Sequence, residues 1–210
     1  MISGLKIRLD RRARALLAAL ALSLLSIPSA WAFDLAELMG LLAQQKSGEA
    51  RFTEQRFVRG LEGPLNASGE LSFSAPDRLT RRTLTPRPET MSVEGNTLTL
   101  SRGGRTRTLA LDSMPELLGM VEAMRSTLGG KPEGLQRYFR STVSGSAGAW
   151  SLDLQPIDAR LAAQVRAMRL SGRGGEVLGI EMEFIGGDRS VMNITPERRA
   201  ETAAPARRGP

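Results

Sequence analysis

The sequence contains no cysteine and no histidine, and its aromatic residues are limited to two tryptophans, one tyrosine and six phenylalanines. Without cysteine, no disulfide can stabilise the chain. Without histidine, the chain lacks the commonest metal ligand and the usual general base at neutral pH. The composition therefore argues against a metal centre and against a serine nucleophile activated by a histidine.

Carboxylates remain as candidates for catalysis. Glu181 and Glu183 share one face of a predicted strand and could form the acid pair of a glycosidase. The opposite face of this strand carries Leu178, Ile180, Met182 and Phe184. A solvated outer face would present the same two glutamates, and we favour that interpretation. The glycine pairs Gly103-Gly104, Gly174-Gly175 and Gly186-Gly187 read as hairpin turns that no helix start follows, so they do not form a phosphate-binding loop. We expect no enzyme, no cofactor and no bound metal.

Both ends of the chain differ from its middle. Residues 1–14 are basic, residues 15–25 are apolar, and small residues flank Trp31. This order is typical of a secretory signal peptide, here cleaved after Ala32, and the apolar run is too short for a membrane anchor. Residues 197–210 are rich in Arg, Ala and Pro and predict a disordered tail. We therefore expect residues 33–196 to form one domain outside the cytoplasm.

The positive charge of the chain lies mainly at these ends. The formal net charge is +7, of which residues 1–32 contribute +4 and residues 197–210 contribute +2. The remaining +1 leaves residues 33–196 nearly neutral. A nucleic-acid-binding domain needs a basic footprint on its folded part, so we expect no nucleic-acid partner.

Helical spacing of apolar residues begins at Asp34. Leu35, Leu38, Met39 and Leu42 form the stripe of a first helix. Asp34 and Glu37 have the spacing of a capping box. A second helix is predicted from Pro115 to the pair Gly129-Gly130, and a short third helix over residues 132–140.

Elsewhere the apolar residues have a period of two, which is typical of strands with one buried face. Strands are predicted over residues 49–59, 68–74, 79–84, 90–94, 150–155, 168–171, 178–184 and 190–195. Residues 96–111 predict a hairpin about Gly103-Gly104 that places Leu98, Leu100, Leu109 and Leu111 on one face. These elements predict an α+β fold in which helices cover the apolar face of an antiparallel sheet. The leucine face is then either plain core or the lining of a pocket.

The order of these elements resembles the LolA family of periplasmic carriers of outer-membrane lipoproteins. The landmarks are Phe52, Thr53 and Gln55 after the first helix, then Gly69, Leu71 and Phe73 before Pro76, then Glu94, Gly95, Thr97 and Leu98, then the helix start at residues 115–118, and finally Thr195-Pro196. The resemblance extends over about residues 34–196. Each landmark is weak alone, and the ordered set carries the resemblance.

The resemblance implies an incomplete β-barrel, or half-barrel, covered by an amphipathic helical lid. It implies a monomeric periplasmic protein that binds the acyl chains of a lipoprotein or another lipid, receives them from an inner-membrane transporter and passes them to an outer-membrane acceptor. The predicted lipid-binding residues are Phe52, Leu71, Phe73, Leu98, Leu100, Leu109, Leu111, Met120, Met124, Trp150, Leu152, Ile180, Met182 and Phe184.

The sequence also departs from the family pattern. The family often has an arginine before the strand-end proline, where it holds the lid, and this sequence has Ala75 there. Arg78, Arg81 or Arg82 could bond the lid helices instead, although arginines on a strand are more commonly exposed. An alternative function is a periplasmic regulator of the RseB/MucB type, which senses lipids or peptides. Those regulators carry an additional domain, so we favour the carrier.

Overall fold

The structure, a computed structural model, describes residues 33–197. The predicted signal peptide and, apart from Glu197, the predicted tail lie outside the described residues. The helices are α2 (Leu35–Leu42), the 3-10 turn η1 (Leu111–Ser113), α3 (Pro115–Leu128), α4 (Pro132–Tyr138) and α5 (Ala159–Ala162). The strands are β1 (Ser47–Phe57), β2 (Leu65–Ser74), β3 (Arg78–Thr85), β4 (Glu89–Glu94), β5 (Thr97–Arg102), β6 (Arg105–Ala110), β7 (Phe139–Ser146), β8 (Ala149–Pro156), β9 (Val165–Arg173), β10 (Glu176–Phe184) and β11 (Arg189–Glu197).

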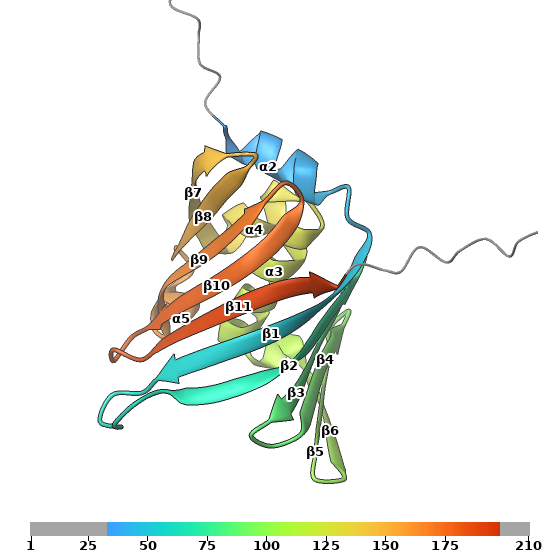
Figure 1. Cartoon of the computed structure of the whole chain (residues 1–210), viewed down its shortest axis with the longest axis vertical. Helices are drawn as coiled ribbons and strands as arrows, with labels where there is room; N and C mark the ends of the chain where they lie inside the picture. Colours follow the sequence, from blue (N-terminus) through green and yellow to red (C-terminus); the bar gives the residue numbers. More distant parts are fainter. Residues whose placement is uncertain (1–32, 198–210) are drawn as a thin grey trace, which may run out of the picture. The chain divides into compact units, whose positions relative to one another are not determined.

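The strands form one sheet of eleven members in the order β6-β5-β4-β3-β2-β1-β11-β10-β9-β8-β7 (Figure 1). All the pairs are antiparallel, and β6 and β7 are the two edges, so the sheet does not close. This confirms the expected α+β class and the large antiparallel sheet. Nine of the ten strand pairs join strands that are consecutive in the chain, and the tenth joins the two ends of the domain: β1 lies beside β11, with Phe52 opposite Ile194.

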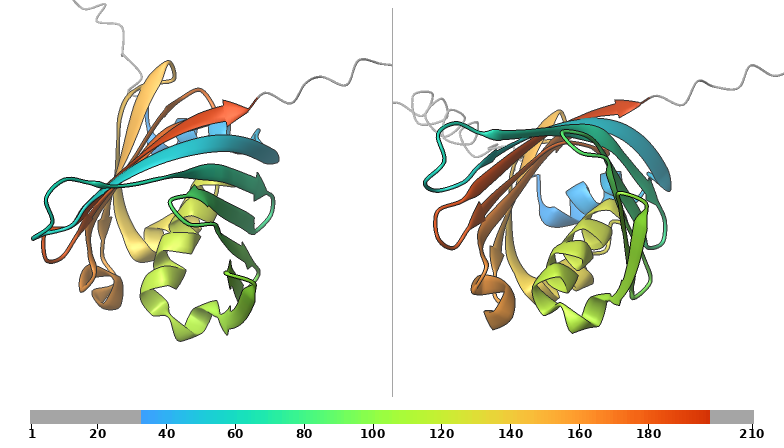
Figure 2. Two further views of the ribbon diagram at one scale, coloured as in Figure 1. Left: turned by 60° about the horizontal axis from the view of Figure 1, so that its bottom comes forward. Right: turned by 90° about the horizontal axis from the view of Figure 1, so that it is seen from below.

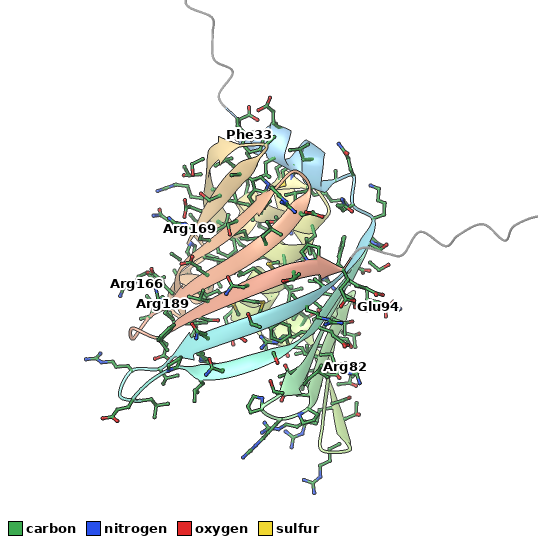
Figure 3. The ribbon with its side chains drawn as sticks, in the orientation of Figure 1. Phe33, Arg82, Glu94, Arg166, Arg169 and Arg189 are labelled. Atoms are coloured by element: carbon green, nitrogen blue, oxygen red, sulfur yellow. The ribbon has the colours of Figure 1, made fainter. Side chains whose placement is uncertain are left out.

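The alternation of side chains gives the sheet two different faces. On one face, the inner face, apolar residues of β4–β5 and β8–β11 pack against the helices. The outer face carries charged side chains, among them Arg169 and Arg189 (Figure 3). Figure 2 shows that the sheet curves around α3, which lies inside the curve.

The helix starts follow local sequence signals. The Asp34 carboxylate accepts a hydrogen bond from the Glu37 amide at 2.9 Å, and the Glu37 carboxylate accepts one from the Asp34 amide at 3.3 Å, which confirms the predicted capping box. Helices α3 and α4 both have proline in their first turn, where its missing N–H costs nothing. Within residues 33–197, no helix combines the length and apolar character needed to cross a membrane.

One strand was not predicted and one helix is shorter than predicted. The third helix ends at Tyr138, and the chain continues directly into β7. Only Phe139 of β7 is buried, because β7 is an edge strand and half of its residues are exposed serine, threonine and glycine. The weak apolar alternation of such an edge strand explains why the pattern did not reveal it.

Candidate functional site

Two separate apolar clusters hold the helices against the inner face. The large cluster joins α2, α3, α4 and α5 to β7–β10, and Leu38, Leu135, Leu152, Leu161 and Leu170 are fully buried within it. The small cluster consists of Val93, Leu98, Leu111 and Val121 and joins β4, β5 and η1 to α3. The sheet order places β3, β2, β1 and β11 between these two clusters.

We call the inner face of these four strands the central face. It comprises Met192 and Ile194 of β11, Phe52 and Glu54 of β1, Leu71 and Phe73 of β2, and Leu79 and Arg81 of β3. Phe52, Phe73 and Met192 are buried but belong to neither cluster, whereas Leu71, Leu79 and Ile194 are half-buried. The helix packing is therefore less complete over the central face than at its two sides.

The predicted lipid-binding residues fall into three groups by exposure. Phe52, Phe73, Leu98, Leu111, Trp150 and Leu152 are buried. Leu71, Leu100, Met120, Met124, Ile180, Met182 and Phe184 are half-buried. Leu109 is exposed, at 39 %. Most of these predicted residues belong to one of the two clusters or pack against it. The exceptions are Phe52, Leu71, Phe73 and Leu109.

Trp150 has a structural role of its own. Its indole N–H donates a hydrogen bond of 3.0 Å to the carbonyl of Gly174, and its ring lies where a Cβ on Gly172 would come within 2.4 Å of it. Leu152 is in the same row of β8 and is fully buried. These two side chains are firmly packed, so a ligand would reach the half-buried members of the set first.

The β5–β6 hairpin forms about Gly103-Gly104 as predicted, with φ of 58° and 75° at the two glycines. Leu98 pairs with Leu109 and lies on the predicted face, and Leu111 continues that face into η1. Leu109 lies directly opposite the buried Leu98 but is exposed, because it belongs to the edge strand β6. The half-buried Leu100 is two residues closer to the hairpin tip and packs against the small cluster.

The central face also carries charge, which the sequence did not reveal. A carboxylate oxygen of Glu54 accepts a hydrogen bond of 2.6 Å from the Ser190 hydroxyl, and the other oxygen pairs with the Arg81 guanidinium. The guanidinium carbon of Arg81 lies 4.6 Å from the centre of the Phe52 ring. Arg81 and Glu54 are only 29 % and 14 % exposed. The sequence of β3 did contain an indication of this charge on the inner face. Leu79 and Arg81 are two residues apart, so their side chains lie on the same face of the strand.

None of the three candidate arginines bonds a helix among the described residues. Arg78 pairs with Glu94 at 2.6 Å and Arg82 with Glu70 at 3.3 Å, both in exposed positions. The hydrogen bond and charge of Glu94 raise the pKa of Arg78 above its ordinary value. Arg81 is the only one of the three that faces inward, and it bonds a strand.

The polar link between helix α3 and the sheet comes from an arginine of the helix and not from an arginine of the sheet. Arg125 of α3 donates from Nε to the carbonyl of Asp77 at 2.9 Å and from Nη2 to the carbonyl of Gly95 at 2.8 Å. Asp77 in turn accepts a hydrogen bond of 3.0 Å from the Gly95 amide. The Arg125 side chain is only 10 % exposed and also pairs with Glu122. One arginine thus fixes α3 to the β2–β3 and β4–β5 turns.

Two shallow hollows are present on the outer face. The first, of about 250 Å³, is lined mainly by polar residues of β1–β3 with Glu197, and the second, of about 420 Å³, by residues such as Thr53, Asn66 and Asn193. No helix residue lines either one. Among residues 33–197, no group of three acidic side chains has the arrangement needed to hold a metal ion.

Comparison with known proteins identifies one matching family model, described as "Outer membrane lipoprotein carrier protein LolA-like", over residues 27–206. No curated protein is a significant match. Similar solved structures include a LolA superfamily protein from Nitrosomonas europaea, with 9 % identity over 79 % of this chain and 94 % of that one at a TM-score of 0.43. A putative outer membrane lipoprotein-sorting protein domain from Vibrio parahaemolyticus is 10 % identical. The match covers 81 % of this chain and 92 % of that one, at a TM-score of 0.40. A chain of the MucA/MucB complex of Pseudomonas aeruginosa is 15 % identical. The match covers 80 % of this chain and 59 % of that one, at a TM-score of 0.34.

Proposed function

Because this chain belongs to the LolA-like family of outer membrane lipoprotein carrier proteins, we propose that it is a periplasmic carrier that binds acyl chains between α3 and the inner face of its sheet. In this proposal α3 acts as the lid. The cargo is an acylated lipoprotein or another acylated lipid, received from an inner-membrane transporter and passed to an acceptor at the outer membrane.

The observation that carries the proposal is the incomplete burial of apolar side chains both on α3 and on the inner face of the sheet that curves around it (Figure 2). Met114, Leu117, Leu118, Met120, Met124 and Leu128 of α3 and its N-terminal flank are half-buried. So are Met91 and Leu100 on the sheet, which pack against the small cluster beside α3. Interior leucine and methionine are usually fully buried, and apolar surface that stays accessible is a common mark of a binding site.

An acyl cargo gives this arrangement a physical purpose. Leaving an acyl chain in water costs about 0.8 kcal/mol per CH₂ group, so one long chain requires on the order of ten kcal/mol of shielding. A carrier must provide that shielding and still release the chain. Methionine suits both needs because its side chain is flexible and polarizable and adapts to differently shaped partners. Met91 supplies such a side chain on the sheet, and Met120 and Met124 supply such side chains on α3.

Entry of a chain requires α3 to move from the sheet. The small cluster contains four buried residues, of which α3 contributes Val121, and α3 also contributes Ala123 to the large cluster, against which Met120, Met124 and Leu128 pack. The Arg125 link to the carbonyls of Asp77 and Gly95 is the polar contact that such a movement would break. A tilt of α3 away from β4 and β5 would break the small-cluster contact and this polar link while the large-cluster contact stays in place, so the lid can close again once the cargo has left.

Native mass spectrometry of the protein isolated from its own periplasm tests the proposal. We expect the wild type to carry acylated molecules and Leu100→Glu to lose them, because a carboxylate at this half-buried position would face the acyl chain. Thr99→Glu is the matched control, since Thr99 lies next to Leu100 on the opposite face of β5 and should leave the load unchanged. Circular dichroism verifies that both variants are folded. A folded Leu100→Glu variant with the wild-type load would refute the proposed pocket.

A further inference from the structure

The polar group on the central face is built around one carboxylate. Glu54 uses one oxygen to accept the Ser190 hydroxyl from β11 and the other to accept Arg81 from β3. These two partners lie on opposite sides of β1 in the sheet. Both carboxylate oxygens are therefore engaged, and Glu54 is held in one orientation.

Arg81 is in a different situation from Glu54. Its Nη2 pairs with Glu54 and its guanidinium lies over the Phe52 ring, so two contacts fix its plane. Within residues 33–197 the structure describes no hydrogen-bond partner for its Nε or Nη1. A guanidinium has five N–H donors in a rigid fork, and here part of that fork remains available.

The surroundings of Arg81 are apolar along its row of the sheet. Leu71 is its neighbour on β2 and Met91 its neighbour on β4, and Leu100 follows on β5. All three are half-buried. A ligand whose apolar part lies along this row therefore meets a fixed hydrogen-bond donor in the middle of an apolar surface.

The next residue along β3 provides a direct contrast. Arg82 pairs with Glu70 on the outer face, where the two side chains are 61 % and 50 % exposed. Exposed pairs of this kind contribute little to stability and are common on protein surfaces. The inner pair is 29 % and 14 % exposed, and partial burial of charge is unfavourable unless hydrogen bonds compensate it. Its position calls for a role that the outer pair does not have.

We propose that Arg81, oriented by Glu54 and Phe52, hydrogen-bonds the carbonyl oxygen of the ester or amide that links an acyl chain to its cargo. This inference rests on the proposed carrier function and specifies which part of the cargo is recognised. The charge of the site favours a neutral acceptor. Glu54 already balances the Arg81 charge, so a second anion would be repelled by Glu54 about as strongly as it is attracted by Arg81. A carbonyl gains the directional hydrogen bond without that repulsion.

Three ligands with the same chain length separate the contribution of a neutral carbonyl to binding from the contributions of a negative charge and of the apolar chain. Methyl palmitate has an ester carbonyl, palmitate has a carboxylate, and hexadecane has only the chain. Each is titrated against an apolar fluorescent probe bound to the purified protein, and displacement gives the relative affinity. We expect the wild type to prefer methyl palmitate to the other two. Arg81→Met should weaken methyl palmitate about tenfold and leave hexadecane unchanged, because one hydrogen bond to a charged donor is lost.

Two further variants make the assignment specific. Arg82→Met is the matched control and should leave all three affinities unchanged, because it removes the equivalent pair from the outer face. Glu54→Gln keeps the side-chain size and removes the negative charge. It should therefore shift the preference toward palmitate, since Arg81 then carries an unbalanced positive charge.

The outcomes distinguish the two proposals. If the wild type binds none of the ligands or the probe, the carrier function itself is refuted. If it binds hexadecane as tightly as methyl palmitate, or if Arg81→Met weakens all three ligands equally, acyl binding stands and the carbonyl site is refuted. A wild-type preference for palmitate would refute the neutral acceptor and indicate an anion site.

Discussion

Phe52 of β1 lies opposite Gly69 of β2, at a point where the next strand approaches so closely that a Cβ on Gly69 would be 2.0 Å from the carbonyl oxygen of Arg82. The β2–β3 register shifts here, between Ser68 and Gly69. The absence of a side chain on Gly69 thus allows the close strand approach beneath Phe52, on which Arg81 stacks. Gly69 connects the backbone geometry of the sheet to the polar group on its central face.

Gly69→Ala should therefore destabilise the protein by about 3 kcal/mol, because the methyl group would overlap backbone atoms that cannot rotate away. Urea unfolding measures the change as a lower transition midpoint. Gly48→Ala in β1 is the control, since a Cβ there meets nothing within 4 Å and should change the stability by less than about 1 kcal/mol. Equal stability of the Gly69 and Gly48 variants would contradict the close approach.

Thr127, near the end of α3, is fully buried, and its hydroxyl has no hydrogen-bond partner in the described part of the chain. Thr127→Val removes the hydroxyl and keeps the shape, so we expect the free energy of unfolding to rise by about 1 kcal/mol. Thr127→Ser keeps the hydroxyl and loses the methyl group, and it should lower the stability by about 1 kcal/mol. Thermal or urea unfolding of the pair checks both signs. A less stable Thr127→Val variant would mean that the hydroxyl is satisfied in solution.

The elements predicted correctly are those with local signals. The capping box of Asp34 and Glu37 involves residues three apart, and the β5–β6 hairpin depends on two adjacent glycines with positive φ. Both features are encoded within a few residues of sequence. The family, too, was predicted from the order of short landmarks, and the family model confirms it.

The features that were missed depend on contacts distant in sequence. The Arg81–Glu54 pair joins residues 27 apart and the Ser190–Glu54 bond residues 136 apart, so neither follows from local pattern. Arginine on a strand usually faces water, which favoured the outer face for Arg81. The same applies to Arg125, whose partners are main-chain carbonyls and carry no sequence signature. The division of apolar residues into packed and half-buried ones also depends on how far α3 covers them.

Arg125 offers the most direct test of whether α3 opens. Arg125→Met keeps much of the apolar length of the side chain and removes both hydrogen bonds to the β2–β3 and β4–β5 turns. Because the side chain is only 10 % exposed, we expect a loss of about 2–3 kcal/mol in stability. We also expect faster amide hydrogen exchange in α3 than in the wild type, while α4 and β8 keep their protection.

The same variant should change the kinetics of probe uptake. If breaking the Arg125 link is part of opening, Arg125→Met should bind an apolar fluorescent probe several-fold faster in stopped-flow mixing. Arg137→Met on the exposed side of α4 is the control and should leave the uptake rate unchanged. Uptake at the wild-type rate despite faster exchange in α3 would show that the probe enters without movement of this helix, and the lid would then have to be sought elsewhere in the fold.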